Sequence, residues 1–138
     1  MGLIIDTNIF IDAEHHRLVL KELTALSEYG EAYIATITVS ELLAGVHLAK
    51  TPEARIQRSA FVEGVLSAIP CLPFDEAVAR TYAELYAHFL KSNPRIRRIP
   101  NVHDLQIAAT GITNGFAVLT NNVQDFGKIP GLKIETPC

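Results

Sequence analysis

The sequence predicts an α/β domain in which a central, mostly parallel sheet of four to five strands lies between two layers of helices. Short apolar runs of strand character alternate along the chain with longer segments of helical periodicity. Strands joined through helices form right-handed crossovers, which cover a parallel sheet on both faces. The chain has 138 residues, 49% of them hydrophobic, which is enough for one such domain over residues 1–138.

The strands are expected where β-branched or aromatic side chains gather in short runs. Residues 3–5, 32–36 and 116–120 have this character. A further run over 69–74 contains two prolines, which remove hydrogen-bond donors and therefore place that strand at an edge of the sheet. A short fifth strand is expected at 132–134.

The helices are expected where apolar spacing meets residues typical of helix ends. One helix directly follows the first strand, and another is expected over 17–28. Thr51–Pro52 begins a helix that runs to about residue 67, since Thr is a good N-cap and Pro suits the first helical position. Asp75 caps the next helix, and the helix that begins at Asn101 stops at Asn114–Gly115.

Composition and charge limit the classes of function. The formal charge of −3 excludes overall basicity as a basis for nucleic-acid binding, so any such binding needs a local patch. Cys71 and Cys138 form neither a disulfide framework nor a zinc motif, which fits a reducing compartment. No signal-peptide pattern is present, and no apolar run approaches the roughly 18 residues of a membrane span. We therefore expect a soluble, cytoplasmic domain without a membrane partner.

Four carboxylates occur at equivalent places in this predicted fold. Asp6 follows the first strand, and Asp125 follows the fourth. Glu41 and Asp104 lie in the first turns of two helices. Because helices run antiparallel to the strands in such a fold, helix starts and strand ends share one edge, where ligands bind. These acids are therefore expected to meet there.

Each acid taken alone also fits a helix cap. The sequence Thr-Val-Ser-Glu from Thr38 to Glu41 is a complete capping box and predicts that a helix begins at Thr38. Acidic residues in first turns also interact favourably with the helix dipole. Capping does not explain why four such termini should converge, so we favour a shared site.

Converging carboxylates predict a hard divalent cation. Two carboxylates about 5 Å apart repel by about 3 kcal/mol at an effective dielectric of about 20, so a cluster must bind protons or a cation. Oxygen ligands select Mg²⁺ or Mn²⁺. The five histidines form no zinc set and are interpreted as surface residues or as supports of the ligands. Such a centre would activate water for in-line attack at phosphorus.

A local basic segment precedes Asp104. Lys91, Arg95, Arg97 and Arg98 fall within eight residues, in a stretch without acids. We expect this segment to lie over the acidic edge and to bind the phosphates of a flexible single-stranded nucleic acid. The alternative is that these charges only keep an exposed loop solvated.

Four motifs in order resemble those of PIN-domain ribonucleases. They are Asp-Thr-Asn at 6–8, Thr-Val-Ser-Glu-Leu at 38–42, His-Asp-Leu-Gln-Ile-Ala-Ala at 103–109 and Leu-Thr-Asn-Asn-Val-Gln-Asp-Phe at 119–126. The length and the stretch at 41–46 are similar to VapC toxins of toxin–antitoxin pairs, and the resemblance covers essentially the whole chain. It implies a PIN fold and a Mg²⁺- or Mn²⁺-dependent endoribonuclease. It also implies a homodimer, inhibited by a VapB-type antitoxin and able to join a larger toxin–antitoxin assembly.

The resemblance also implies the site residues by position. Many relatives carry an acid where Asn122 stands, and others carry one just before the phenylalanine, where Asp125 stands here. The implied catalytic metal ligands are Asp6, Glu41, Asp104 and Asp125, supported by Thr7, Asn8, Thr120 and Asn122.

Three hypotheses follow for the function. The leading one is cleavage of RNA phosphodiesters by metal-activated water. The second is a PIN scaffold that has lost catalysis and acts as a binding module, for which Asn122 is the only support. The third is a phosphoryl-transfer domain with Asp6 as nucleophile, but such enzymes usually carry a second acid at the position of Asn8. The sequence leaves open the RNA target, the number of metals, the antitoxin and the dimer face.

Overall fold

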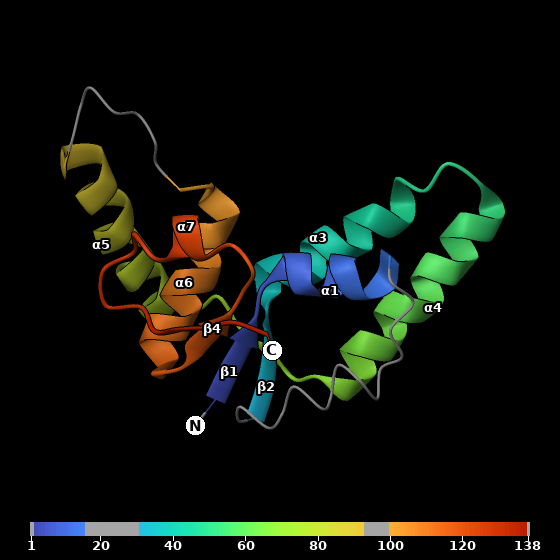
Figure 1. Cartoon of the computed structure of the whole chain (residues 1–138), viewed down its shortest axis with the longest axis horizontal. Coiled ribbons are helices and arrows are strands. Elements are labelled where there is room, and N and C mark those ends of the chain that lie inside the picture. Colours follow the sequence, from blue (N-terminus) through green and yellow to red (C-terminus); the bar gives the residue numbers. More distant parts are fainter. Residues whose placement is uncertain (1, 16–30, 93–99, 138) are drawn as a thin grey trace.

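A computed structural model describes residues 2–15, 31–92 and 100–137 of the chain (Figure 1). Within these residues one sheet has the order β3-β2-β1-β4-β5, and every neighbouring pair of strands is parallel. The predicted α/β fold is therefore confirmed, with five strands that are all parallel. The strands are β1 (Gly2–Ile5), β2 (Glu31–Ala35), β3 (Cys71–Leu72), β4 (Ala117–Leu119) and β5 (Ile134–Glu135).

The central strand β1 is buried on both faces. Leu3 and Ile5 pack in one apolar cluster, whereas Ile4 packs in a second cluster on the opposite face, as expected for side chains that alternate along a strand. The first cluster is completed by α1 (Thr7–His15), α3 (Thr36–His47) and α4 (Pro52–Ala68), and the second by α5 (Glu76–Ser92), α6 (Val102–Asn114) and α7 (Val123–Phe126). Figure 1 shows these two groups of helices on opposite sides of the sheet.

Helix ends with a local signal lie where the sequence places them. Thr51 caps α4 by accepting a hydrogen bond from the Ala54 N–H at 3.1 Å. Asp75 caps α5 by accepting from the Val78 N–H at 3.0 Å. Gly115 ends α6 in the left-handed region, at a φ of 72°, where a residue without Cβ is favoured.

The start of α3 differs from the prediction. The helix begins at Thr36, directly after β2, and its N-cap Ala35 makes no side-chain hydrogen bond. Thr38 is fully buried inside the first turn and contacts Thr7. The capping box at Thr38–Glu41 was therefore a wrong prediction, because its Thr binds a side chain of another helix and not the backbone. Glu41 consequently lies in the second turn of α3.

The two outer strands are shorter or shifted relative to the prediction. β3 covers only two residues of the predicted run 69–74, but it is an edge strand, as the two prolines indicated. β5 begins at Ile134, which is two residues later than predicted. The predicted helix over 17–28 lies outside the described residues. None of the helices within the described ranges is long and apolar enough to cross a membrane.

Candidate active site

Asp6 stands at the junction of β1 and α1. Its N–H donates to the Leu119 carbonyl at 2.9 Å, which continues the pairing of β1 with β4 beyond the last strand residue. Its side chain is only 1% exposed. Oδ2 accepts a hydrogen bond from Thr120 Oγ1 at 2.9 Å, and the backbone N–H groups of Thr7 and Asn8 donate to the same carboxylate. The chain therefore positions this buried acid with three donors.

The burial of Asp6 governs its protonation. Loss of water raises the pKa of its carboxyl above the usual value, while the hydrogen bonds from Thr120, Asn8 and Thr7 act in the opposite direction. The nearby charge of Glu41 raises it slightly further. The effect of burial on the pKa is larger than the opposing effect of the three donors, so the charged form of Asp6 is still disfavoured in the folded protein.

Asp104 lies opposite, in the first turn of α6. The N-cap Asn101 begins this helix by accepting from the His103 N–H at 2.8 Å. The pKa of Asp104 is raised to about 6, first by burial and then by the negative charges of Asp6, Asp125 and Glu41. The structure therefore brings all four candidate acids together around Asp104.

Glu41 is held from two sides. Its Oε1 accepts a hydrogen bond from Thr7 Oγ1 at 2.9 Å, and its Oε2 lies 3.3 Å from His103 Nδ1. Its side chain is 30% exposed, so part of the carboxylate faces solvent. The Thr7 side chain thus contacts the site directly, in the region where the sequence placed a supporting residue.

Asp125 and Asn122 form a pair at the start of α7. Asn122 Nδ2 donates to Asp125 Oδ2 at 3.1 Å, and Asn122 Oδ1 lies 3.4 Å from the Asp125 N–H. The Asn122 N–H in turn donates to Thr120 Oγ1 at 2.9 Å. Thr120 therefore links the Asp6 carboxylate to the turn that carries Asp125, and the Asn122 side chain is directed to Asp125.

Among the other predicted site residues, the described side chains form no hydrogen bond or ion pair with the four acids. The side chain of Asn8 is exposed, and only its backbone N–H contacts Asp6. Lys91 is exposed near the end of α5. Arg95, Arg97 and Arg98 lie outside the described residues.

Sequence reasoning interpreted the histidines only as surface residues or supports of the ligands, and it did not identify the contacts of His103 with Glu41 and of Thr38 with Thr7. The position of His103 directly before Asp104, in a motif that begins with it, was the available signal for this residue. For Thr38 the only signal was its place in the Thr-Val-Ser-Glu motif, which also fits a cap.

The donor set fits a hard divalent cation. All four acids offer oxygen, and the raised pKa of Asp104 records an excess of negative charge that a cation would relieve. Among the described residues, however, no three His, Cys, Asp or Glu side chains form a ready-made metal site. The oxygen donors and the negative charge of these residues therefore suit a cation, but the side chains are not arranged closely enough to surround one.

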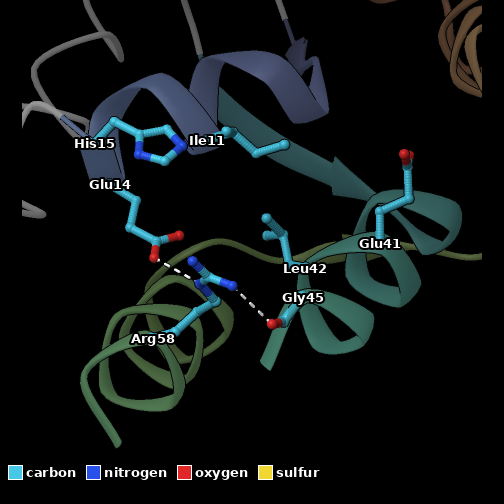
Figure 2. A pocket seen from close by; sticks show the side chains of 7 residues that line it. All are labelled: Ile11, Glu14, His15, Glu41, Leu42, Gly45 and Arg58. Carbon is cyan, nitrogen blue, oxygen red and sulfur yellow. Dashed lines mark hydrogen bonds and ion pairs between the residues drawn. The ribbon is translucent and has the colours of Figure 1, made fainter. Parts of the chain in front are cut away.

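A hollow of about 170 Å³ lies next to the acidic edge, between α1, α3 and α4 (Figure 2). At its far end Arg58 Nε donates to Glu14 Oε1, and Arg58 NH1 donates to the Gly45 carbonyl, both at 2.9 Å. This arginine therefore ties α4 to the two helices that carry Thr7 and Glu41. The hollow is lined by Ile11, Glu14, His15, Glu41, Leu42, Gly45 and Arg58.

Comparison with known proteins agrees with this arrangement. The PIN domain matches residues 3–132 of the chain. Ribonuclease VapC1 of Rickettsia felis is 42% identical over 136 residues, which cover 99% of this chain and 96% of that protein. The chain belongs to the VapC family of PIN-domain ribonuclease toxins. The family predicted from the four motifs is thereby confirmed.

Other members of the VapC family are similar in sequence and in structure. The tRNA(fMet)-specific endonuclease VapC of Salmonella typhimurium is 30% identical over 105 residues, covering 76% of this chain and 74% of that protein. The crystal structure of VapBC2 from Rickettsia felis, bound to a DNA fragment from its promoter, contains a chain that superposes with a TM-score of 0.85. The two chains are 25% identical and cover each other completely.

Proposed function

We propose that this VapC-family protein is a Mg²⁺- or Mn²⁺-dependent endoribonuclease whose ligands are Asp6, Glu41, Asp104 and Asp125. The proposal rests above all on Asp104, whose pKa is raised to about 6 by burial and by three neighbouring carboxylates. Such a cluster binds protons or a cation near neutral pH, and its oxygen donors favour a hard divalent ion. The chain is proposed to act as one domain over residues 1–138.

The acids are proposed to divide the work. Asp6 serves as a fixed ligand, because three donors hold its carboxylate at the end of β1. Asp104 serves as the ligand whose negative charge most needs a cation to balance it. Glu41 serves as a further ligand or orients the attacking water. When bound, a divalent cation lowers the pKa of that water and neutralises charge on the phosphate oxygens. Asp125, held by Asn122, completes the anionic edge.

The substrate is proposed to be single-stranded or looped RNA. Ribonuclease activity is the activity named for the R. felis relative, and a transfer RNA is the substrate named for the Salmonella relative. Lys91, Arg95, Arg97 and Arg98 are proposed to bind its phosphates. The last three belong to residues 93–99, which precede α6 and Asp104 in the sequence.

The proposed partner is a VapB-type antitoxin. The R. felis and S. typhimurium neighbours are VapBC proteins bound to DNA. For this chain we propose a cytoplasmic homodimer that an antitoxin inhibits by covering the acidic edge, within a larger toxin–antitoxin assembly. We propose that the antitoxin inserts an arginine at this edge, and mutation of that arginine is expected to restore cleavage.

The direct test is cleavage of mixed single-stranded RNA and of transfer RNA by purified protein, with Mg²⁺, with Mn²⁺ and with EDTA. The proposal expects cleavage that requires metal and disappears in Asp104→Asn. Cleavage that persists in Asp104→Asn or Asp6→Asn, in protein free of contaminating nuclease, contradicts the assignment. A wild type that cleaves neither RNA and does not bind Mn²⁺ supports the alternative of a binding scaffold.

A further inference from the structure

We propose that His103 and Thr38 are positioning residues that fix the carboxylate of Glu41, one for each of its two oxygens. This inference rests on the proposed nuclease function and extends it to two residues outside the acidic set. Neither side chain needs to touch the RNA or the cation. Their proposed effect on cleavage passes mainly through Glu41, although His103 also interacts electrostatically with the adjacent Asp104.

The contacts of Glu41 join three helices. Oε1 accepts from Thr7 Oγ1, which belongs to α1, and Oε2 faces Nδ1 of His103, which belongs to α6. Glu41 itself lies on α3. A carboxylate has about four sites for accepting hydrogen bonds, so one partner on each oxygen fixes its orientation and leaves further sites free.

The hydroxyl groups of Thr38 and Thr7 form a chain that leads to Glu41. Thr7 Oγ1 lies 3.0 Å from Thr38 Oγ1 and 2.9 Å from Glu41 Oε1. Thr7 Oγ1 has donor geometry to both partners, but its single hydrogen can serve only one of them at a time. The proposal takes the arrangement in which Thr7 donates to the carboxylate, which can only accept, and the Thr38 hydroxyl turns to donate to Thr7 Oγ1. Thr38 is fully buried and Thr7 nearly so, so water does not readily replace either hydroxyl.

Glu41 needs such positioning because of its neighbours. It lies close enough to Asp6 and Asp104 to raise the pKa of both. Mutual repulsion would turn its partly exposed side chain towards solvent. The hydrogen bond from Thr7 to Oε1 and the 3.3 Å contact of His103 Nδ1 with Oε2 oppose that movement and keep the carboxylate at the acidic edge. The proposal requires Nδ1 to carry a hydrogen, as it can in a neutral imidazole.

The first test uses a series of His103 variants, compared by kcat and KM for RNA cleavage. His103→Asn keeps an amide nitrogen near the position of Nδ1, whereas His103→Gln places its nitrogen near Nε2. We expect His103→Ala and His103→Gln to lower kcat by roughly 10- to 100-fold with an unchanged KM, the range found for groups that support metal ligands. His103→Asn is expected to keep most of the activity.

The second test removes the hydroxyl of Thr38 with little change in volume. Thr38→Val is expected to lower kcat by roughly tenfold, and Thr38→Ser to restore it. A matched control is Thr81→Val, because Thr113 Oγ1 donates to Thr81 Oγ1 at 2.8 Å in a similar threonine pair, between α6 and α5. The control is expected to leave cleavage unchanged. If Thr38→Val does not fold, the exposed His103 decides the proposal.

A spectroscopic readout on the metal-free protein separates positioning from a general structural role. Long-range ¹H–¹⁵N correlation spectra, recorded where the ring is neutral, are expected to place the hydrogen of His103 on Nδ1 in the wild type. In Glu41→Ala the hydrogen is expected to move to Nε2. An unchanged tautomer overturns the His103 half of the proposal.

A double-mutant cycle gives the decisive kinetic comparison. In the Glu41→Ala background, Thr38→Val is expected to have no further effect on cleavage, and His103→Ala a smaller effect than in the wild type, because His103 also interacts with Asp104. Variants with wild-type activity, or losses of undiminished size without Glu41, overturn the inference while the nuclease function stands. A wild-type protein without cleavage overturns the proposed function itself, and the tautomer measurement still tests the contact.

Discussion

Asp6 and Asp104 lie on the same edge of the sheet, but the protein surrounds their carboxylates in different ways. The Asp6 carboxylate is almost fully buried and accepts hydrogen bonds from Thr120 and from two backbone N–H groups. The Asp104 carboxylate has no such donor within the described residues and faces three other acids. At Asp6, the junction between β1 and α1 supplies hydrogen-bond donors to the carboxylate. At Asp104, the start of α6 supplies no such donors, so its negative charge must be balanced by a bound cation.

This difference predicts which of the two negative charges costs the metal-free protein more stability. The donors around Asp6 are part of the fold, because the Thr7 and Asn8 N–H groups belong to the first turn of α1. The charge of Asp104 works against the fold until a cation is bound. Burial raises the pKa of both carboxyl groups, but three hydrogen-bond donors offset part of this effect at Asp6, whereas Asp104 has no such donors within the described residues.

The largest expected effect is on catalysis and is shared by the two acids. Asp6→Asn and Asp104→Asn are each expected to lower RNA cleavage by more than about 100-fold, beyond the range for residues that only support ligands. Initial rates in saturating Mn²⁺ check this. Equal activity of either variant and the wild type would remove that acid from the proposed site.

The second effect separates the two acids through stability without metal. Asp6→Asn is expected to lower the free energy of unfolding by about 1–3 kcal/mol, since the amide NH2 would replace an acceptor oxygen among three donors and leave buried donors unpaired. Asp104→Asn is expected to raise it, on the order of 1–2 kcal/mol at pH 7 after allowance for partial exposure. Urea unfolding of both variants tests the contrast, and the same sign for both would contradict it.

The third effect is the pH dependence of that contrast. The folded pKa of Asp104, about 6, lies above the ordinary 3.8, so the native state holds this proton more tightly than the unfolded chain. Its contribution to stability is present below the unfolded pKa and is lost as pH rises through 6. The wild type should therefore lose stability between pH 4 and 7 relative to Asp104→Asn, as thermal unfolding can measure. Parallel curves for the two proteins would exclude this assignment.

The smallest effect concerns the pair at α7. Asn122→Ala removes both the helix cap and the contact to Asp125, and is expected to cost about 0.5–2 kcal/mol of stability. Asn122→Asp adds a fifth acid to the edge and is expected to raise the pKa of Asp104 further. Carboxyl ¹³C titration by NMR can follow that shift, and a lower pKa would contradict the proposed crowding.

The sequence predicted those features that depend on neighbouring residues. Thr51, Asp75 and Gly115 signalled helix ends through local chemistry, and two prolines marked the edge strand. The alternation of strands and helices was sufficient to place the acids at one edge, because parallel topology fixes where the termini lie.

The features that were wrong or missed depend on residues far apart in the chain. Thr38 has the local pattern of a cap, but its hydroxyl contacts Thr7, 31 residues earlier, inside the fold. The position of His103 next to Asp104 suggests a place near the site, but its contact with Glu41 on another helix depends on the packed structure. The different treatment of Asp6 and Asp104 likewise follows from burial and donors, which only the packed structure determines.

The most direct test of the central claim is calorimetric titration of the metal-free protein with Mn²⁺ near pH 6, in buffers of different ionisation enthalpy. We expect the wild type to bind Mn²⁺ with release of protons, because the cation displaces the proton that Asp104 holds at this pH. Asp104→Asn should bind more weakly and release fewer protons. Folded wild-type protein that does not bind Mn²⁺ would contradict the claim that this acidic edge is a cation site, and binding without proton release would contradict the raised pKa of Asp104.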